Sequence, residues 1–528
     1  MSRYPCARRV LLGLAVAWLG VAADKPAPKE AAELPAPKKA DVDDSLPAPP
    51  PSILPPRLSP IDLASTLRLA GVENPEILLA RQRVVEAVAL RQLAAAQALP
   101  NINVGLNIDL HTGVLQQSSG NILEVNRGAL YLGMGANAVA AGTVNVPGIQ
   151  YNVNISQALF GALAARQQVR VREFDSQAVR NDVLLRVASG YVELLRAEGQ
   201  RAVALKNRDL ALDIARLTAD YARTGQGQQS DADRAATELA HRNDEVLAVE
   251  GRVLTASAAL AQLLNLPPDT VLLATDGWVV PAPLVPGPIP VGELVYIAMN
   301  QRPELASARA AIQEAALQLR GAKLLPFSPT LLAGYSTGTF GGGSNLVSQP
   351  GGFGGFQQSR FDQFSSRQDI DVVLYWTAQN LGVGNLAQIR FQRAVLGQRD
   401  LERVRVLNQV RFEVASAYAR THARFAQIGV AEQAVRSGQR SYEEDLKRVR
   451  GLLGSRPIEL LDSYRLLSAA RQQYLDAISD YNRAQFELYV AMGQPPAAVL
   501  ARPVPADLVP PPAVPPGQPG CPPEAGHH

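Results

Sequence analysis

Few residues in this sequence form a pattern that could carry out catalysis. The nearest is Gly382-x-Gly384-x-x-Ala387, which resembles a dinucleotide-binding loop, with Asp400 and Glu402 close to the position of the usual acidic residue. A dinucleotide-binding strand should be a continuous apolar run inside a parallel sheet, whereas the segment before Gly382 alternates apolar and polar residues. A helical pattern of about 60 residues then follows, which is far longer than a βαβ unit contains. A dinucleotide enzyme is therefore the weakest hypothesis, and it predicts measurable NAD binding.

The histidines also form no site. They are scattered along the chain, and none has Cys, Asp or Glu at metal-ligand spacing; they are His111, His241, His422, His527 and His528. Phosphate-binding, nucleophile-elbow and zinc-protease motifs are missing from the sequence. We predict that the protein is not an enzyme and that it holds no cofactor and no metal.

A different chemistry is indicated by residues 100–113, where apolar residues alternate with Asn, Gly and Asp. One interpretation is a half-buried strand of a soluble antiparallel sheet. The other is a strand of a membrane β-barrel, about 10 residues per crossing, with its apolar side toward lipid and its polar side toward a water-filled lumen. On the second interpretation, the lumen-facing candidates are Asn101, Asn103, Asn107, Asp109, Gln150, Asn152, Asn154 and Asp371.

The ends of the chain favour export. Residues 1–23 have a basic start, a short apolar run and a small-residue cleavage site, as secretory signal peptides do. No later segment has 18 uninterrupted apolar residues, so we expect no transmembrane helix. Residues 24–60 read as a Pro-rich linker and 497–528 as a Pro-rich disordered tail. Cys6 would leave with the signal and Cys521 lies in the tail, so we expect no disulfide framework.

Between these ends the chain is a tandem duplication. The motif Pro75-Glu76-Ile77 recurs as Pro303-Glu304-Leu305, and the pair Pro267-Pro268 recurs as Pro495-Pro496. Two further anchors recur at the same spacing, to within one position. We predict a first repeat over 61–268, a Pro-rich connector over 269–290 and a second repeat over 291–496. The net charge of +3 is spread along the chain and suggests no nucleic-acid partner.

Each repeat is predicted to contain the same elements in the same order. A helix with the Pro-Glu motif precedes a strand, a polar insert, a second strand, a very long helix, a Gly-containing turn and a return helix. The strands are 100–113, 149–156, 330–340 and 370–377, and the inserts, which we expect to be surface loops, are 112–147 and 341–367. The helical hairpins are 161–224 with 231–265 and 384–450 with 458–492, and their small apolar residues are typical of coiled coils.

Four strands cannot enclose a pore, because about eight is the smallest number for a membrane barrel and open sheet edges are not tolerated in lipid. Several copies would therefore have to complete the wall, with two giving eight strands and three giving twelve. The fold class we predict is an α+β membrane protein with duplicated strand pairs and long coiled-coil helices. The leading alternative is a soluble periplasmic coiled-coil scaffold whose short sheets mediate interactions.

These motifs, in this duplicated order, resemble the TolC-type outer-membrane efflux protein family over about residues 60–496. The resemblance rests on the two Pro-Glu helices, Leu99-Pro100 and Leu325-Pro326, Asn380-Leu381-Gly382-x-Gly384, and the last helix from Ser455. It implies a homotrimer with a 12-stranded β-barrel in the outer membrane and an α-helical barrel in the periplasm. It also implies a passive exit duct for efflux or type I secretion, which works with a periplasmic adaptor and an inner-membrane pump.

The resemblance also suggests roles for individual residues. Glu459 and Asp462, one helical turn apart, are the candidates for an acidic constriction at the periplasmic end, where carboxylates would favour cations. Alternatively, they only complement the helix dipole. The adaptor-docking candidates are in the two turns, which need glycine in any case; they are Thr224, Gly225, Gln226, Gly227, Gly451, Leu452, Leu453 and Gly454. The single glycine at Phe160-Gly161 departs from the family pattern at the first strand-to-helix junction.

Overall fold

The computed structural model describes residues 57–136, 146–276, 279–285, 287, 289–344, 364–451 and 457–496. The predicted signal peptide, most of the predicted linker and the predicted tail lie outside these residues. The last residues of the predicted linker belong to a short strand, β1 (Arg57–Ile61).

The helices confirm the duplication. Every helix of the first repeat has a counterpart of nearly equal length at the corresponding place in the second repeat. In the first repeat they are α1 (Leu63–Glu73), α2 (Pro75–Ala96), α3 (Ile155–Arg223) and α4 (Gln229–Leu263). In the second repeat they are α5 (Val291–Gln301), α6 (Pro303–Leu324), α7 (Val383–Arg450) and α8 (Pro457–Ala491). Two 3₁₀ turns, η1 (Leu325–Phe327) and η2 (Gln379–Gly382), join helix α6 to its strand and the last strand to α7.

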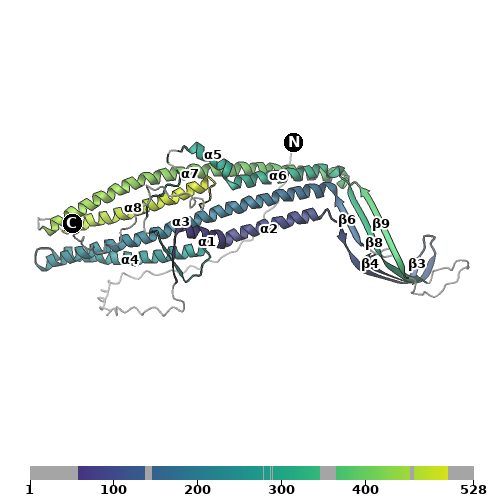
Figure 1. The fold of residues 1–528 in the computed structure, drawn as a ribbon, viewed down its shortest axis with the longest axis horizontal. Helices are drawn as coiled ribbons and strands as arrows, with labels where there is room; N and C mark the ends of the chain where they lie inside the picture. The colour runs from purple at the N-terminus through teal and green to yellow at the C-terminus, as the bar shows by residue number, and fades with distance from the viewer. Residues whose placement is uncertain are drawn as a thin grey trace, which may run out of the picture. The chain divides into compact units, whose positions relative to one another are not determined.

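The predicted long helices are present. Helix α3 has 69 residues and α7 has 68, and neither contains a proline, which would interrupt the hydrogen-bond ladder. Helix α3 ends before Gly225, whose φ of 74° suits a residue without a Cβ, and the chain then turns back into α4. Helices α3 and α4 form one antiparallel hairpin, and α7 and α8 form the other (Figure 1).

The lateral order of the helices follows from their contacts. Toward the strands the order is α2–α3–α6–α7, and toward the turns it is α4–α3–α8–α7. Among the described helices, α3 therefore packs between neighbours along its length, whereas α7 has α6 and α8 on one side and otherwise contacts the short helix α5. This leaves α2, α4 and α7 at the open edges of the helical layer.

The strands form two sheets. A small parallel sheet pairs β1 with β7 (Thr270–Ala274). The main sheet is antiparallel and contains β2 (Asn101–Ile102), β3 (Val104–Gln116), β4 (Ile122–Ala136), β5 (Val146–Pro147), β6 (Ile149–Asn154), β8 (Thr330–Ser344) and β9 (Ser365–Tyr375). Segments β6 and β4 pair in succession with the same side of β8, so they act as one strand path. The sheet therefore has four paths, β2/β3, β4/β6, β8 and β9.

One prediction about the first repeat is wrong. The insert 112–147, expected to be a surface loop, is largely strand, since β3 continues to Gln116 and β4 occupies Ile122–Ala136. Consequently, the first strand pairs mainly with β4, and only Asn101 and Ile102 pair with β6. The physical reason is that Leu130, Leu132 and Met134 continue the period-two alternation, and a long hairpin satisfies the backbone hydrogen bonds that a loop would leave to water.

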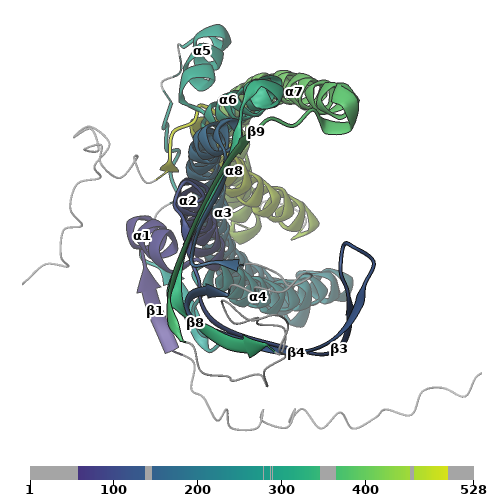
Figure 2. The same ribbon diagram turned by 90° about the vertical axis from the view of Figure 1, so that its right-hand side faces the viewer.

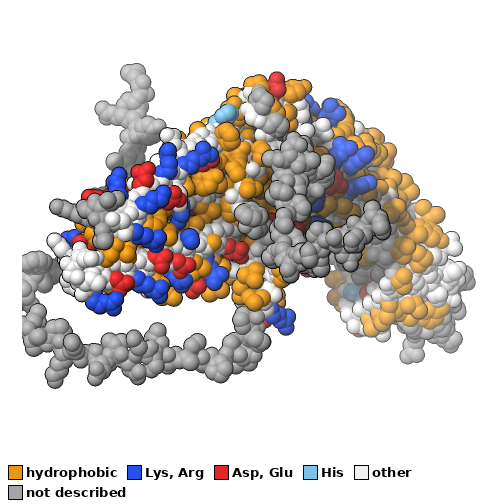
Figure 3. All heavy atoms as spheres, turned by 60° about the vertical axis from the view of Figure 1, so that its left-hand side comes forward, with side chains coloured by type: hydrophobic (Ala, Val, Ile, Leu, Met, Phe, Trp, Pro, Cys, Tyr) orange, Lys and Arg blue, Asp and Glu red, His pale blue; other side chains and the backbone are white. Residues whose placement is uncertain are grey.

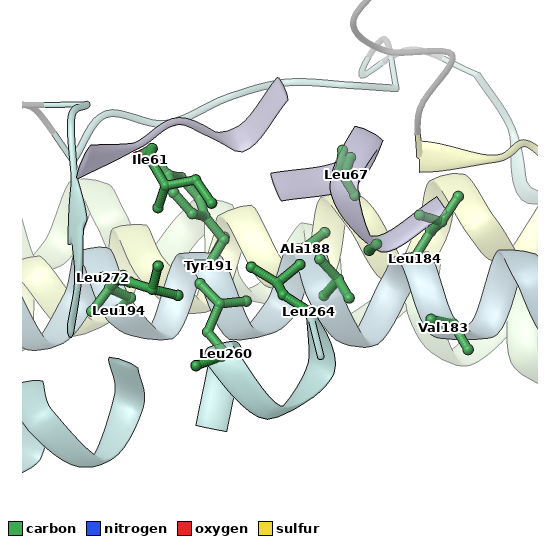
Figure 4. Close-up of a cluster of buried hydrophobic side chains, with 14 of the residues drawn as sticks. Ile61, Leu67, Val183, Leu184, Ala188, Tyr191, Leu194, Leu260, Leu264 and Leu272 are labelled. Atoms are coloured by element: carbon green, nitrogen blue, oxygen red, sulfur yellow. The ribbon is translucent and has the colours of Figure 1, made fainter. Parts of the chain in front are cut away.

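The helices are held together by two main cores, one in each repeat. The first packs α1, α3, α4 and β7 around Tyr191, Leu260 and Leu272, which are at most 1% exposed (Figure 4). The second packs the corresponding helices α5, α7 and α8 around Leu294, Val414 and Leu488. Both cores lie beside the Pro-Glu motifs, where the short helices meet the long ones.

Helix α4 contains, within the described residues, the one segment long and apolar enough to cross a membrane by length and composition. Yet α4 packs along α3 and is the repeat of α8, and it carries Glu238 and Arg242 in an ion-pair network. We therefore interpret α4 as one arm of a helical hairpin.

Candidate functional site

The main sheet has one polar and one apolar face. The register places Asn101, Gln150, Gly334 and Asp371 side by side in one row across the four strand paths. Residues directly opposite in a ladder point to the same side, and sides alternate along each strand. By this rule all eight predicted lumen-facing residues lie on one face of the sheet. Figure 2 shows the sheet itself, which curves from β9 through β8 and β4 to β3.

The opposite face is apolar and open. Val104, Leu106, Ile108 and Leu110 on β3 are 56–79% exposed, and Ile370, Val372 and Leu374 on β9 are 51–73% exposed. Between these strands the same face carries further apolar side chains, including Leu130, Leu132, Met134, Tyr151, Val153, Leu331 and Tyr335. An exposed apolar surface this continuous is unusual for a protein dissolved in water and marks a surface that something else covers.

The sequence did not indicate the residues at the centre of the polar face. Tyr131 on β4 is 1% exposed, and its ring lies against Gly338 on β8, where a Cβ would come within 2.8 Å of the Tyr131 hydroxyl. Beside it, the Arg367 guanidinium stacks 5.2 Å from the centre of the Phe340 ring and pairs with Asp369 at 2.9 Å. These residues come from three strand paths, so only the pairing register brings them together.

The hairpin turns hold the predicted docking residues at the surface. Thr224, Gly225 and Gln226 are exposed, and the N–H groups of Gln226 and Gly227 donate to the carbonyl of Tyr221. The Tyr221 hydroxyl donates to the carbonyl of Val449 at 2.9 Å, which ties the first turn to the end of α7. Gly451 is exposed, whereas Leu452, Leu453 and Gly454 lie outside the described residues.

The predicted acidic pair lies on the exposed side of α8. Glu459 and Asp462 are both exposed in its first two turns, while Leu460 and Leu461 between them are buried in a core shared by the two hairpins. The two acids are three positions apart, so they share one helix face. The geometry therefore places both carboxylates on one face of α8 near the turns of the hairpins.

A second acidic residue near the turns has a quite different environment. Glu238 on α4 is 4% exposed, and its carboxylate accepts hydrogen bonds from Arg465 on α8 at 2.7 Å and from Arg242 at 2.7 Å. Burial raises the pKa of Glu238, but the hydrogen bonds from Arg465 and Arg242 outweigh it, so the pKa lies below the ordinary 4.5. Arg242 also lies 5.4 Å from the centre of the Tyr464 ring, whose hydroxyl donates to the Asn207 carbonyl. This network joins the two hairpins.

The residues of the dinucleotide-like motif do not form a dinucleotide-binding loop in the structure. It follows β9 in an antiparallel sheet, and its start is a bend in which Asn380, Leu381 and Gly382 all have positive φ. In the part of the chain that the structure describes, no group of three or more His, Cys, Asp or Glu is placed to hold a metal ion.

Charged and hydrophobic side chains occupy different parts of the surface. Lys, Arg, Asp and Glu gather toward the turns of the hairpins, and hydrophobic side chains gather over the strands (Figure 3). The strand region thus matches an apolar environment and the hairpin ends an aqueous one.

Comparison of the sequence with protein-family models gave no match, and comparison with curated proteins also gave none. Comparison of the structure with solved structures gave clear matches to outer-membrane channels. The CmeC outer membrane channel of Campylobacter jejuni aligns with a TM-score of 0.65 at 14% identity, covering 82% of this chain and 85% of CmeC. The outer membrane protein VceC of Vibrio cholerae gives 0.59 at 17% identity, covering 82% and 96%.

The MtrE outer membrane channel of Neisseria gonorrhoeae, in its open state, gives a TM-score of 0.60 at 16% identity, covering 82% of this chain and 89% of MtrE. The chain therefore has the fold of TolC-type outer-membrane channels, as the sequence motifs predicted. At these sequence identities the comparison establishes the fold alone.

Proposed function

We propose that this chain is one protomer of a homotrimeric TolC-type channel in the outer membrane of a Gram-negative-type bacterium, with its helices in the periplasm. The observation that carries the proposal is the open apolar face that runs in register across all four strand paths. Lipid tails cover such a face without needing hydrogen bonds, and the polar face would then line water.

Closure of the wall is supported by the order of the elements. Each strand path is joined in the chain to one helix. The lateral order of the strand paths, β2/β3, β4/β6, β8 and β9, is the same as the lateral order of the helices to which they are joined, α2, α3, α6 and α7. Adding a copy edge to edge therefore extends the sheet and the helical layer together. The edge helices carry exposed apolar side chains, such as Leu79 and Val85 on α2 and Phe391 and Phe412 on α7, which such contacts would bury. Three copies give the twelve strands that the family resemblance implies.

The trimer would act as a passive exit duct for an efflux pump or a type I secretion system. Asn, Gln and Asp side chains on the polar face provide a wetted wall that binds little specifically. Glu459 and Asp462 would supply six carboxylates where the tube narrows, and the hairpin turns would meet a periplasmic adaptor that links the duct to an inner-membrane pump. An energy source in the duct itself is unnecessary, because the pump supplies it.

Fractionation of cells that make the full chain tests this proposal. The protein should sediment with outer membranes, resist extraction by carbonate and high salt, and run as a trimer in detergent. A monomer that is soluble without detergent would instead support the periplasmic scaffold and overturn the channel.

The docking surface is tested separately by in-cell cross-linking from single cysteines. A cysteine at Gln226 should cross-link to an exported, inner-membrane-anchored adaptor, whereas one at Gln97, which is exposed near the strand end of α2, should not. Equal capture from both positions would remove the turns as the docking site.

A further inference from the structure

Among the described residues, the core of the second repeat has an apolar hollow on its surface. It has a volume of about 350 Å³ and lies between the connector, α5, α7 and α8. Its walls are mainly apolar and aromatic, with Ile289, Tyr418, Phe425, Tyr481 and Leu488 among the lining residues. The hollow opens to solvent, so its apolar side chains are left in contact with water unless a further apolar side chain covers them.

The first repeat shows what normally fills this position. There, β7 runs parallel to β1, with Leu272 opposite Ser59. The Leu272 side chain is 0% exposed and packs in the core with Ile61, Tyr191 and Leu260 (Figure 4). Its N–H donates to the Ser257 hydroxyl at 2.7 Å.

The residues that surround Leu272 form its seat in the first repeat, and the residues that line the hollow are their counterparts in the second repeat. The internal duplication, which relates Pro75 to Pro303, relates Ile61 to Ile289, Tyr191 to Tyr418 and Leu260 to Leu488 in the same way. All three of these second-repeat residues line the hollow, and so do the counterparts of Ser59, Leu194, Val253 and Ser257, which are Gly287, Thr421, Tyr481 and Gln485. This correspondence at seven positions indicates that the hollow is the second-repeat counterpart of the Leu272 seat.

The seat in the second repeat is also less well covered than in the first. Tyr191 is 1% exposed and Ile61 is 7% exposed, whereas their counterparts Tyr418 and Ile289 are only half-buried. One part of the seat is taken by the connector, because the Gln485 side-chain oxygen accepts from the N–H groups of Leu284 and Val285 at 3.1 and 3.0 Å. The apolar hollow beneath remains.

The segment that should fill it can be read from the sequence. The stretch 267–274, PPDTVLLA, includes β7 and recurs as PPAAVLAR at 495–502, so that Leu500 is the counterpart of Leu272. The described chain reaches Pro496, after Leu488 and Met492 have entered the second core. Leu500 is only four positions beyond Pro496, an extended reach of about 14 Å.

We propose that residues 498–502 of the same chain pair as a parallel strand beside Val285, Gly287 and Ile289 and insert Leu500 into this hollow. The second repeat then acquires the counterpart of the β1–β7 sheet, and the start of the C-terminal segment is anchored to the helices.

Disulfide trapping in the full chain, with Cys521→Ser to remove the native tail thiol, tests the proposal. Leu500→Cys with Thr421→Cys should form a disulfide within one chain, detected as a linked peptide by mass spectrometry. Ala501→Cys with Thr421→Cys is the matched control, because neighbouring strand residues point to opposite sides. Equal linking of the two pairs, or linking of Leu500→Cys only between chains, would overturn the proposal.

Trypsin provides a second measurement that needs no new cysteine. Because Pro503 makes the Arg502–Pro503 bond resistant to trypsin, the measurement is made in Pro503→Ala, where cleavage after Arg502 should be slow in the folded protein. It should accelerate several-fold when Leu500→Asp is added, because a carboxylate cannot enter the apolar seat. Ala501→Asp should leave the rate unchanged. Rapid cleavage of the Pro503→Ala protein, or the same rate after Leu500→Asp and Ala501→Asp are each added to it while the helical content is preserved, would contradict the docked strand. Neither experiment depends on whether the chain forms a channel.

Discussion

At the scale of single residues, Glu238 links the two helical hairpins near their turns. Its carboxylate is nearly fully buried on α4 and bonds to Arg465 on α8, which belongs to the other repeat. A buried carboxylate without partners would be costly, but here two guanidinium groups satisfy its oxygens. Arg465 is half-exposed, so the stabilisation by this pair is well below that of a fully buried one.

This arrangement predicts a pH-dependent stability. Because the pKa of Glu238 is lowered in the folded protein, its contribution is fully present above about pH 4.5 and is lost as the pH falls through the lowered value. Urea unfolding in detergent should therefore show the unmodified protein to be more stable than Glu238→Gln at pH 7, with the difference shrinking below pH 4.5. Asp231→Asn, which removes an ion pair within one helix, is the control. A difference that is constant between pH 7 and 4 would contradict the role of the ion pairs.

The exposed acids Glu459 and Asp462 make a prediction about conduction. If they ring the pore in three copies, Glu459→Gln/Asp462→Asn should reduce the preference for cations in single-channel recordings, because the carboxylate field is removed. Glu443→Gln/Glu444→Gln removes the same charge from exposed residues on α7 and serves as the control. Unchanged selectivity and conductance in the first variant would leave the acids with only a helix-dipole role.

At the scale of elements, the two Pro-Glu helices begin in different ways although their lengths are equal. Asn74 caps α2, because its side-chain oxygen accepts from the Glu76 N–H at 2.9 Å while its amide donates to the Leu263 carbonyl at 2.7 Å. Arg302 stands at the corresponding position of α6 and provides no cap; it pairs with Glu304 and Glu413 instead. The duplication has thus kept the helix start and changed the side chain that stabilises it.

Replacing Asn74 separates its two roles. Asn74→Ala should lower the free energy of unfolding by about 1–2 kcal/mol, because the cap and the bond to α4 are both lost. Asn74→Ser retains a capping oxygen and loses only the bond to Leu263, so its effect should be smaller. Denaturant unfolding followed by circular dichroism measures both, and equal losses would show that the cap contributes nothing.

At the scale of the whole molecule, the sheet and the helical layer are open at both edges and have the same lateral order. A single chain therefore leaves its apolar sheet face and its edge helices uncovered. On the proposed function, edge-to-edge contact between copies within a bilayer would cover the apolar face and the edge helices together. Insertion of the sheet into lipid and assembly of the tube would then depend on each other.

Two neighbouring residues on β3 test which face meets lipid. Ile108→Arg places a charge on the apolar face and should disfavour membrane assembly by about 2–4 kcal/mol if the residue lies near the bilayer midplane. Asn107→Arg places the same charge on the polar face and should assemble normally. The yield of detergent-extracted trimers from outer membranes measures the difference. If Asn107→Arg is the more harmful variant, the faces are reversed.

How much was visible in the sequence depends on how local each signal is. The long helices, the Pro-Glu helix starts and the polar and apolar alternation follow from periodicity and from proline placement, which act over a few residues. The duplication is a direct comparison of the chain with itself. The same alternation continues through Leu130, Leu132 and Met134, so β4 could have been found, but the Gly and Asn around it indicated a loop more strongly.

Local patterns in the chain were enough to predict the repeated order of helices and strands, the polar and apolar faces of the strands, and a number of strands too small to enclose a pore. Only the tertiary structure decided that β4 lies between β3 and β8, that Tyr131, Phe340 and Arg367 meet on one face, and that Glu238 meets Arg465. The physical reason is that pairing register and helix packing depend on contacts between residues far apart in the chain, which local periodicity does not encode.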